Sequence, residues 1–211
     1  KAPKHLNKVF FGGCYGSDAI EQAMKLSYHI HFDRGFKRKT KYIFREQSFS
    51  GASLQAMSVS DIPLLNFFEP LKPSGYLKVS EHNYLHKHFA GESPAQYVER
   101  CSMELENCII NNDPDTITAF CGETMLGSLR GDVPPCPGYW QSIRRICDKY
   151  NIHIILDEIY AGMCRPGMVY CCSYDDFSPD FICIGKAAAG GYAPISAVIT
   201  RSEFEDVIAN G

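Results

Sequence analysis

Two short apolar runs, each ending at a chemically distinctive residue, constrain the fold more than any other feature of the sequence. Residues 152–156 are mostly apolar and β-branched and stop at Asp157, and residues 180–184, apolar after Asp180, run in the same way to Gly185 and Lys186. Such short continuous runs are typical of strands buried on both faces of a sheet. Residues 17–32, 94–111 and 137–150 show helical periodicity, and these segments alternate with strand-like runs along the chain. Strands that alternate with helices predict an α/β domain, with a mostly parallel sheet flanked by helices.

The rest of the chain fits the same scheme. Further strands are expected at residues 8–11, 42–44, 116–121 and 193–200, and a helical turn at 53–58. Residues 61–94 are rich in Pro, Gly and His without periodicity, so we expect a long irregular excursion there. With 211 residues, 45% of them apolar and 21% charged, the chain can bury the core of one domain.

Composition also excludes several classes of function. The formal net charge is −3, and the one basic run, at residues 34–41, is short enough to be a solvated loop, so we expect no nucleic-acid partner. No apolar run in the sequence approaches the roughly 20 residues that a membrane span needs. We also expect no secretory signal. Ten cysteines, several within apolar runs and without a recurring CxxC pair, fit free thiols better than disulfides or zinc ligands. We therefore expect a cytoplasmic protein without a bound metal.

Asp157 and Lys186 are the first candidates for chemistry. A carboxylate directly after a buried strand is costly unless it meets a cation or a strong donor, although a plain helix cap is the simpler alternative for Asp157 alone. Lys186 lies between an apolar strand and a run of small residues, where desolvation would favour an amine nucleophile, while a structural lysine remains the alternative. Lys186 follows Asp157 by 29 residues, one strand–connection–strand unit, so both side chains can face one pocket.

Other strand ends supply complementary groups. Gly16 and Ser17 open a helix after a strand, where free backbone N–H groups and a hydroxyl suit a phosphate, and Phe49 could stack on a flat ring. Each signal is weak alone, since N-caps and core aromatics are common. Because ligands collect at the carboxyl ends of strands, an amine, a carboxylate, a phosphate cradle and an aromatic face together predict pyridoxal 5'-phosphate (PLP) as cofactor.

The segment from Tyr139 to Val198 resembles the class-III, or ornithine-aminotransferase-like, family of PLP enzymes. It contains ILDEIYAGMCRPG and PDFICIGKAAAGGYAPISAVI, similar to the family's ILDEV…GMGRTG and PDI…GKGLGGGYPISAV. VFFGGCYGSDAIEQAMKL, REQSFSGASLQAMSVS and CGETMLGS resemble further family segments. Chiefly residues 61–97 lack a match. The resemblance implies the fold type I large domain over residues 1–211, without the family's N-terminal segment and C-terminal small domain.

The resemblance also implies roles at matching positions. Lys186 would form the Schiff base with PLP and shuttle protons, and Asp157 would keep the pyridine nitrogen protonated. The remaining positions would surround the cofactor. Gly16 and Ser17 would bind its phosphate, and Phe49 and Ile159 would pack on the two faces of its ring. Tyr160 would contact the ring hydroxyl, and Glu123 would line the pocket wall. The implied reaction moves an amino group from an amine or amino acid to a keto acid or aldehyde. A homodimer is implied as well.

The sequence departs from the family pattern near these positions. Tyr15, Asp18, Ser50, Thr124, Cys164 and Pro166 stand where the family usually has other residues. Two alternatives to an aminotransferase therefore remain: another class-III chemistry, such as an aminomutase or decarboxylase, or a catalytically incomplete homologue that serves as a binding or scaffold module. A dinucleotide-binding domain is excluded, because no GxGxxG follows the first strand.

Overall fold

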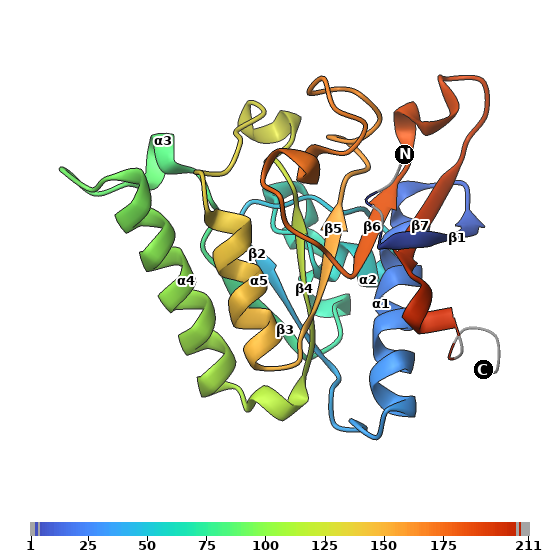
Figure 1. The fold of residues 1–211 in the computed structure, drawn as a ribbon, viewed down its shortest axis with the longest axis horizontal. Coiled ribbons are helices and arrows are strands. Elements are labelled where there is room, and N and C mark those ends of the chain that lie inside the picture. Colours follow the sequence, from blue (N-terminus) through green and yellow to red (C-terminus); the bar gives the residue numbers. More distant parts are fainter. Residues whose placement is uncertain (1–2, 4, 206, 208–211) are drawn as a thin grey trace.

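The computed structural model describes residues 3, 5–205 and 207, which are built around one seven-stranded sheet (Figure 1). Across the sheet the strand order is β1-β7-β6-β5-β4-β2-β3. The strands are β1 (Leu6–Gly13), β2 (Lys41–Arg45), β3 (Tyr76–Val79), β4 (Ile117–Glu123), β5 (His153–Asp157), β6 (Phe181–Ile184) and β7 (Ser196–Arg201). The run β3-β2-β4-β5-β6 is parallel, whereas β7 is antiparallel to both β6 and β1. The predicted mostly parallel sheet is confirmed.

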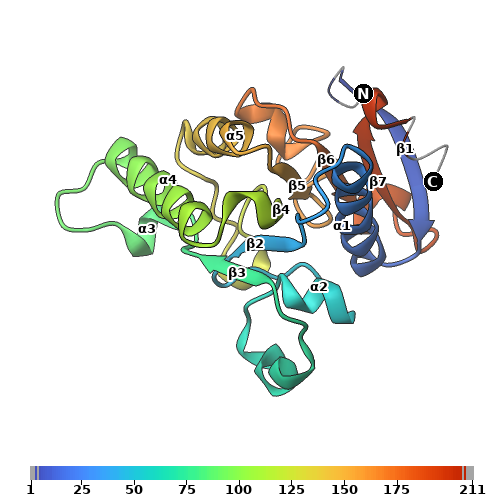
Figure 2. The same ribbon diagram turned by 90° about the horizontal axis from the view of Figure 1, so that it is seen from below.

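Helices cover both faces of the sheet (Figures 1 and 2). The helices are α1 (Gly16–Asp33), α2 (Leu54–Ser58), α3 (Tyr84–Lys87), α4 (Pro94–Asn111) and α5 (Tyr139–Lys149). Helix α1 packs on one face, against β4 to β7, while α4 and α5 pack on the other. Two separate hydrophobic cores result, one on each face.

Strand β5 shows how the sequence fills both cores. Ile154 and Leu156 belong to the core under α4 and α5, and Ile155 belongs to the core under α1; all three are fully buried. Each such side chain contributes roughly 1.5–3 kcal/mol when removed from water. An uninterrupted apolar run is therefore what a two-sided position requires, as the sequence predicts.

Residues 61–94 are more ordered than the sequence suggests. They contain a 3-10 helix (Pro63–Leu71), the edge strand β3 and the short helix α3. Strand β3 pairs in parallel with β2, from Tyr76 opposite Tyr42 to Val79 opposite Arg45. The expectation of a wholly irregular excursion is wrong, because four residues at a sheet edge bury too little to impose a readable pattern.

The remaining boundaries move by a few residues. Strand β7 begins at Ser196 instead of residue 193, since Pro194 has no N–H to give to a ladder. Strand β4 continues to Glu123, beyond the expected residue 121. Within the described residues all ten cysteines are free thiols. No helix in that part of the chain combines the length and the apolar character needed to cross a bilayer.

Candidate functional site

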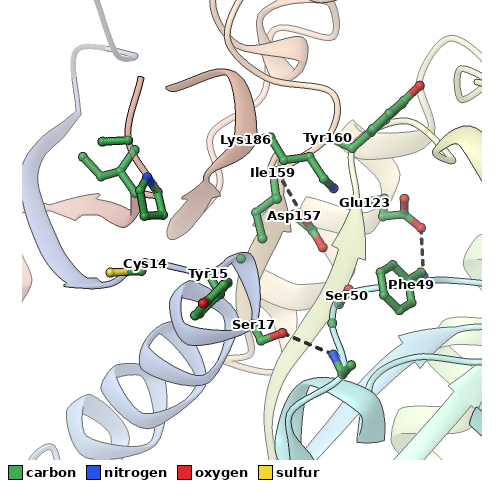
Figure 3. A pocket seen from close by; sticks show the side chains of 16 residues that line it. Cys14, Tyr15, Ser17, Phe49, Ser50, Glu123, Asp157, Ile159, Tyr160 and Lys186 are labelled. Atoms are coloured by element: carbon green, nitrogen blue, oxygen red, sulfur yellow. Dashed lines mark hydrogen bonds between the residues drawn. The ribbon is translucent and has the colours of Figure 1, made fainter. Parts of the chain in front are cut away.

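The carboxyl edge of the parallel strands carries a cavity of about 380 Å³ (Figure 3). Strands β4 and β5 end side by side here, with Glu123 in register with Asp157. Lys186 begins the turn just after β6, and α1 enters from β1. All eight residues predicted from the sequence line this cavity, namely Gly16, Ser17, Phe49, Glu123, Asp157, Ile159, Tyr160 and Lys186. The positions come together as expected; their roles stay predictions.

Asp157 is a buried carboxylate on the floor of the cavity. It is 5% exposed, and its Oδ1 accepts a hydrogen bond from the Ile159 N–H at 3.0 Å. Burial raises the pKa of Asp157, while the Ile159 N–H, the Ser50 hydroxyl and the positive charge of Lys186 oppose that rise. Among the described residues none forms an ion pair with Asp157 within 4 Å. A buried carboxylate with hydrogen bonds but no paired cation suits a ligand that brings a cationic nitrogen.

Lys186 reaches into the same cavity from above. Its side chain extends toward Asp157 in Figure 3, and its Nζ lies 5.5 Å from the centre of the Tyr160 ring. The backbone has a φ of +45°, a left-handed conformation that non-glycine residues adopt at a cost, typically at functional sites. The expectation that Lys186 is desolvated is wrong for the described structure, where the residue is exposed. The small side chains of Ala187 to Ala189 leave it open to solvent.

Glu123 lies on the wall of the cavity. It is 7% exposed, and its two carboxylate oxygens accept the N–H groups of Phe49 at 3.2 Å and Gly127 at 3.0 Å. Burial and the neighbouring charge of Asp157 raise the pKa of Glu123 to about 7. The carboxyl of Glu123 therefore changes charge near neutral pH, in the cavity that Lys186 also lines.

The N-terminus of α1 forms the opposite end of the cavity. Ser17 Oγ accepts the Ala52 N–H at 3.2 Å, which links the helix to the loop after β2. A methyl group on Gly16 would lie 2.9 Å from the Ile159 side chain, and one on Gly51 would lie 2.4 Å from Ser17 Oγ. Position 51, with a φ of +133°, therefore needs glycine, and a side chain at position 16 would displace Ile159. Backbone N–H groups at a helix start, with a hydroxyl beside them, form an anion site.

Asp18 explains one departure from the family pattern. Its Oδ2 accepts the N–H groups of Cys14 at 2.9 Å and Tyr15 at 3.0 Å, so it fixes the loop that leads into α1. Asp18 thus has a structural role, because its carboxylate holds two backbone N–H groups of this loop. Tyr15 is 72% exposed at the rim of the cavity.

The other departures are placed around the cavity. Ser50 faces Asp157 through its hydroxyl, and Thr124 Oγ1 donates to Glu158 at 3.1 Å. Cys164 is exposed. The Tyr160 hydroxyl donates to Asp132 at 3.3 Å, and its role toward a cofactor hydroxyl stays a prediction.

Arg45 is the functional neighbour that the sequence reasoning missed. It is fully buried at the end of β2, donates to the Glu123 carbonyl, and lies 5.3 Å from the centre of the Trp140 ring. Its positive charge opposes the rise in pKa of both Asp157 and Glu123. A usable signal exists, since an arginine that closes the apolar run YIF must find a buried partner.

Comparisons with known proteins give the relatives of this fold and site. The family model described as Aminotransferase class-III matches residues 1–211. "Gamma aminobutyrate transaminase 2" of Solanum lycopersicum is 32% identical over 203 residues, which are 96% of this chain and 44% of the relative. "Probable gamma-aminobutyrate transaminase 3, mitochondrial" of Oryza sativa subsp. indica is 32% identical over 97% of this chain and 40% of the relative. The chain thus spans less than half the length of these relatives.

A solved structure agrees with the sequence relatives. The omega transaminase from Pseudomonas jessenii in complex with PMP superposes with a TM-score of 0.93 and 30% identity, over 99% of this chain and 46% of that one. The sheet flanked by helices is the fold of PLP-dependent transaminases of fold type I. Enzymes of class III depend on PLP, and this chain belongs to the class-III aminotransferase family.

Proposed function

We propose that this chain is the PLP-binding large domain of a class-III aminotransferase, in which Lys186 holds the cofactor and Asp157 pairs with its ring nitrogen. The observation that carries the proposal is the shared cavity: a buried carboxylate, which no cation among the described residues pairs with, lies below an amine that extends toward it. The cavity of about 380 Å³ lies within the range of roughly 300–1,000 Å³ typical of small-molecule sites.

The residues present fit PLP at both of its ends. Gly16 and Ser17 would receive the phosphate at the start of α1, where a Cβ at position 16 would meet Ile159. Phe49 and Ile159 would pack on the two faces of the ring. When bound, PLP supplies an electron sink for the carbon next to the substrate nitrogen.

The chain's own groups would perform the remaining work. Asp157, held by the Ile159 N–H, would keep the ring nitrogen protonated through charge. Lys186 would hold the cofactor and move a proton at its Nζ, while Glu123 and Tyr160 would line the side where the substrate enters. The overall change would be transfer of an amino group from an amine or amino acid to a keto acid or aldehyde.

The test is an absorption spectrum of the complete gene product with added PLP, before and after borohydride, for the wild type and Lys186→Ala. We expect a visible band in the wild type, and a borohydride-stable covalent adduct that peptide mapping assigns to Lys186. The variant should form neither. No band from folded wild-type protein would contradict the proposal and favour a non-catalytic binding module.

We further propose that the protein is a cytoplasmic homodimer. The 3-10 helix Pro63–Leu71 exposes Leu64 (78%) and Phe67 (85%), apolar side chains that a second subunit would cover. Light scattering of the complete gene product tests the assembly, and a monomer at micromolar concentration would contradict it. Cell fractionation tests the location; recovery in an organelle would contradict it.

A further inference from the structure

A second, smaller cavity of about 40 Å³ adjoins the first one beside Lys186. The two share Phe49, Glu123, Tyr160 and Lys186, but only the smaller one is lined by Arg130. With PLP in the larger cavity, as proposed above, the smaller one lies beside Lys186, where the amino group of the substrate would react. This second cavity is far smaller than the larger one of about 380 Å³, so the space suits a compact group.

Arg130 is a cation with capacity left for a ligand. Its Nε lies 3.7 Å from Oε2 of Glu81, which is longer than a hydrogen bond, and its side chain is 32% exposed. Glu81 is 2% exposed and has a second cation, Lys87, with Nζ 3.6 Å from Oε1. Two cations therefore share one carboxylate. The guanidinium of Arg130 presents a planar set of donors that matches a carboxylate.

Arg130 is, in the part of the chain that the structure describes, the charged group at this cavity that is free to bind a carboxylate, because the other charged groups are engaged elsewhere. Asp132 accepts the Tyr160 hydroxyl at 3.3 Å, and Arg165 lies 4.7 Å from the centre of the Tyr160 ring; neither residue is among those that line the cavity. Among the described residues that line the cavity Glu123 is the one carboxyl, and its oxygens accept two backbone N–H groups. Lys186 is the only other lining cation within the described residues, and the proposed function commits it to the cofactor.

We propose that Arg130 binds the carboxylate of the substrate and selects amino acids and keto acids over neutral amines and aldehydes. The inference rests on the proposed function and assigns its substrate class. Glu81 would act as a positioning residue that holds the guanidinium at the cavity.

The experiment compares two amino donors that differ in a carboxylate, 4-aminobutyrate and n-butylamine, with the PLP-loaded complete gene product. The rate at which each donor changes the cofactor absorbance gives kcat/KM. For Arg130→Gln we expect the ratio of kcat/KM for 4-aminobutyrate over n-butylamine to fall about 10- to 100-fold, the usual effect of losing a hydrogen bond between charged groups. Arg130→Lys should recover part of the ratio, and Arg165→Gln, an exposed arginine nearby, should keep it.

Binding of butyrate, which lacks the amine, gives a readout that does not depend on turnover. Calorimetry should show an affinity about tenfold weaker in Arg130→Gln than in the wild type. An unchanged donor ratio and an unchanged butyrate affinity would overturn the assignment of Arg130 and leave the proposed function intact. A wild type that reacts with neither donor, despite a PLP band, would instead overturn the proposed function and this inference with it.

Discussion

Glu123→Gln should change how the stability of the cofactor-free protein depends on pH. The folded-state pKa of Glu123 is raised to about 7, mainly by burial and then by the charge of Asp157, from an ordinary value of 4.5. A raised pKa means that folding binds a proton, so this contribution to stability is fully present below pH 4.5 and is lost as the pH rises through 7. With about 1.36 kcal/mol for each pH unit, the loss between pH 4.5 and 8 amounts to about 3 kcal/mol.

The glutamine variant has no proton to lose. One of the two N–H groups that Glu123 accepts, from Phe49 or Gly127, loses its acceptor, which lowers the stability of the variant by about 1–3 kcal/mol at any pH. The informative quantity is therefore the free energy of unfolding of the wild type minus that of the variant. We expect this difference to fall by about 3 kcal/mol from pH 4.5 to pH 8.

Urea unfolding followed by fluorescence measures that difference, because Trp140 is the single tryptophan and is fully buried. Glu99→Gln, on the exposed face of α4, serves as the control and should follow the wild type at every pH. In an Asp157→Asn background the effect of Glu123→Gln should shrink, since the second cause of the raised pKa is gone. Parallel curves for wild type and Glu123→Gln, or a difference that grows with pH, would refute the reasoning.

Three further substitutions test other parts of the molecule. Asp157→Asn removes the charge proposed to pair with the ring nitrogen, so PLP should bind at least about tenfold more weakly in an absorbance titration; equal affinity would argue against the pairing. His153 is stacked on His31 at 4.0 Å, and burial lowers its pKa to about 3, so the wild type should lose stability as pH falls below 6.5. His153→Leu should remove about 2 kcal/mol of that loss between pH 7 and 5 in urea unfolding, and an unaltered pH dependence would contradict this. Gly51→Ala places a methyl 2.4 Å from Ser17 Oγ at a φ of +133°, and should weaken PLP more than phosphate-free pyridoxal; equal losses would show that the phosphate end is not involved.

The central sheet was readable from the sequence because burial on both faces leaves only one kind of residue acceptable. Strand β5 illustrates this, since Ile154 and Ile155 point into opposite cores and both must be apolar. The same condition does not hold at the sheet edge. Strand β3, with Lys78 exposed between Leu77 and Val79, buries too little on either face to be distinguished from a loop.

The candidate site was readable where residues follow strands directly, and less so where loops decide. Asp157 and Glu123 end neighbouring strands, so their proximity follows from the register. The exposure of Lys186 depends on how residues 187–195 turn, which no periodicity encodes. Arg130 lies in a turn after β4, and its approach to Lys186 results from tertiary packing alone. Arg45 could have been found, because a buried strand that ends in a cation demands a partner.

The pairing of β1 with β7 has a consequence for how the protein is made. Gly13, at the end of β1, pairs with Ser196, although the two are far apart in the sequence. A ribosome that adds roughly 5–20 residues each second needs about ten seconds or more to reach β7 after β1 has emerged. During that interval the exposed Val9 and Phe11 have no strand beside them, and α1 lacks β7, a strand that it packs against. The end of the cavity proposed to hold the phosphate is therefore synthesised first and completed last, so we expect the nascent chain to acquire the proposed affinity for PLP only once residues 196–201 have left the exit tunnel.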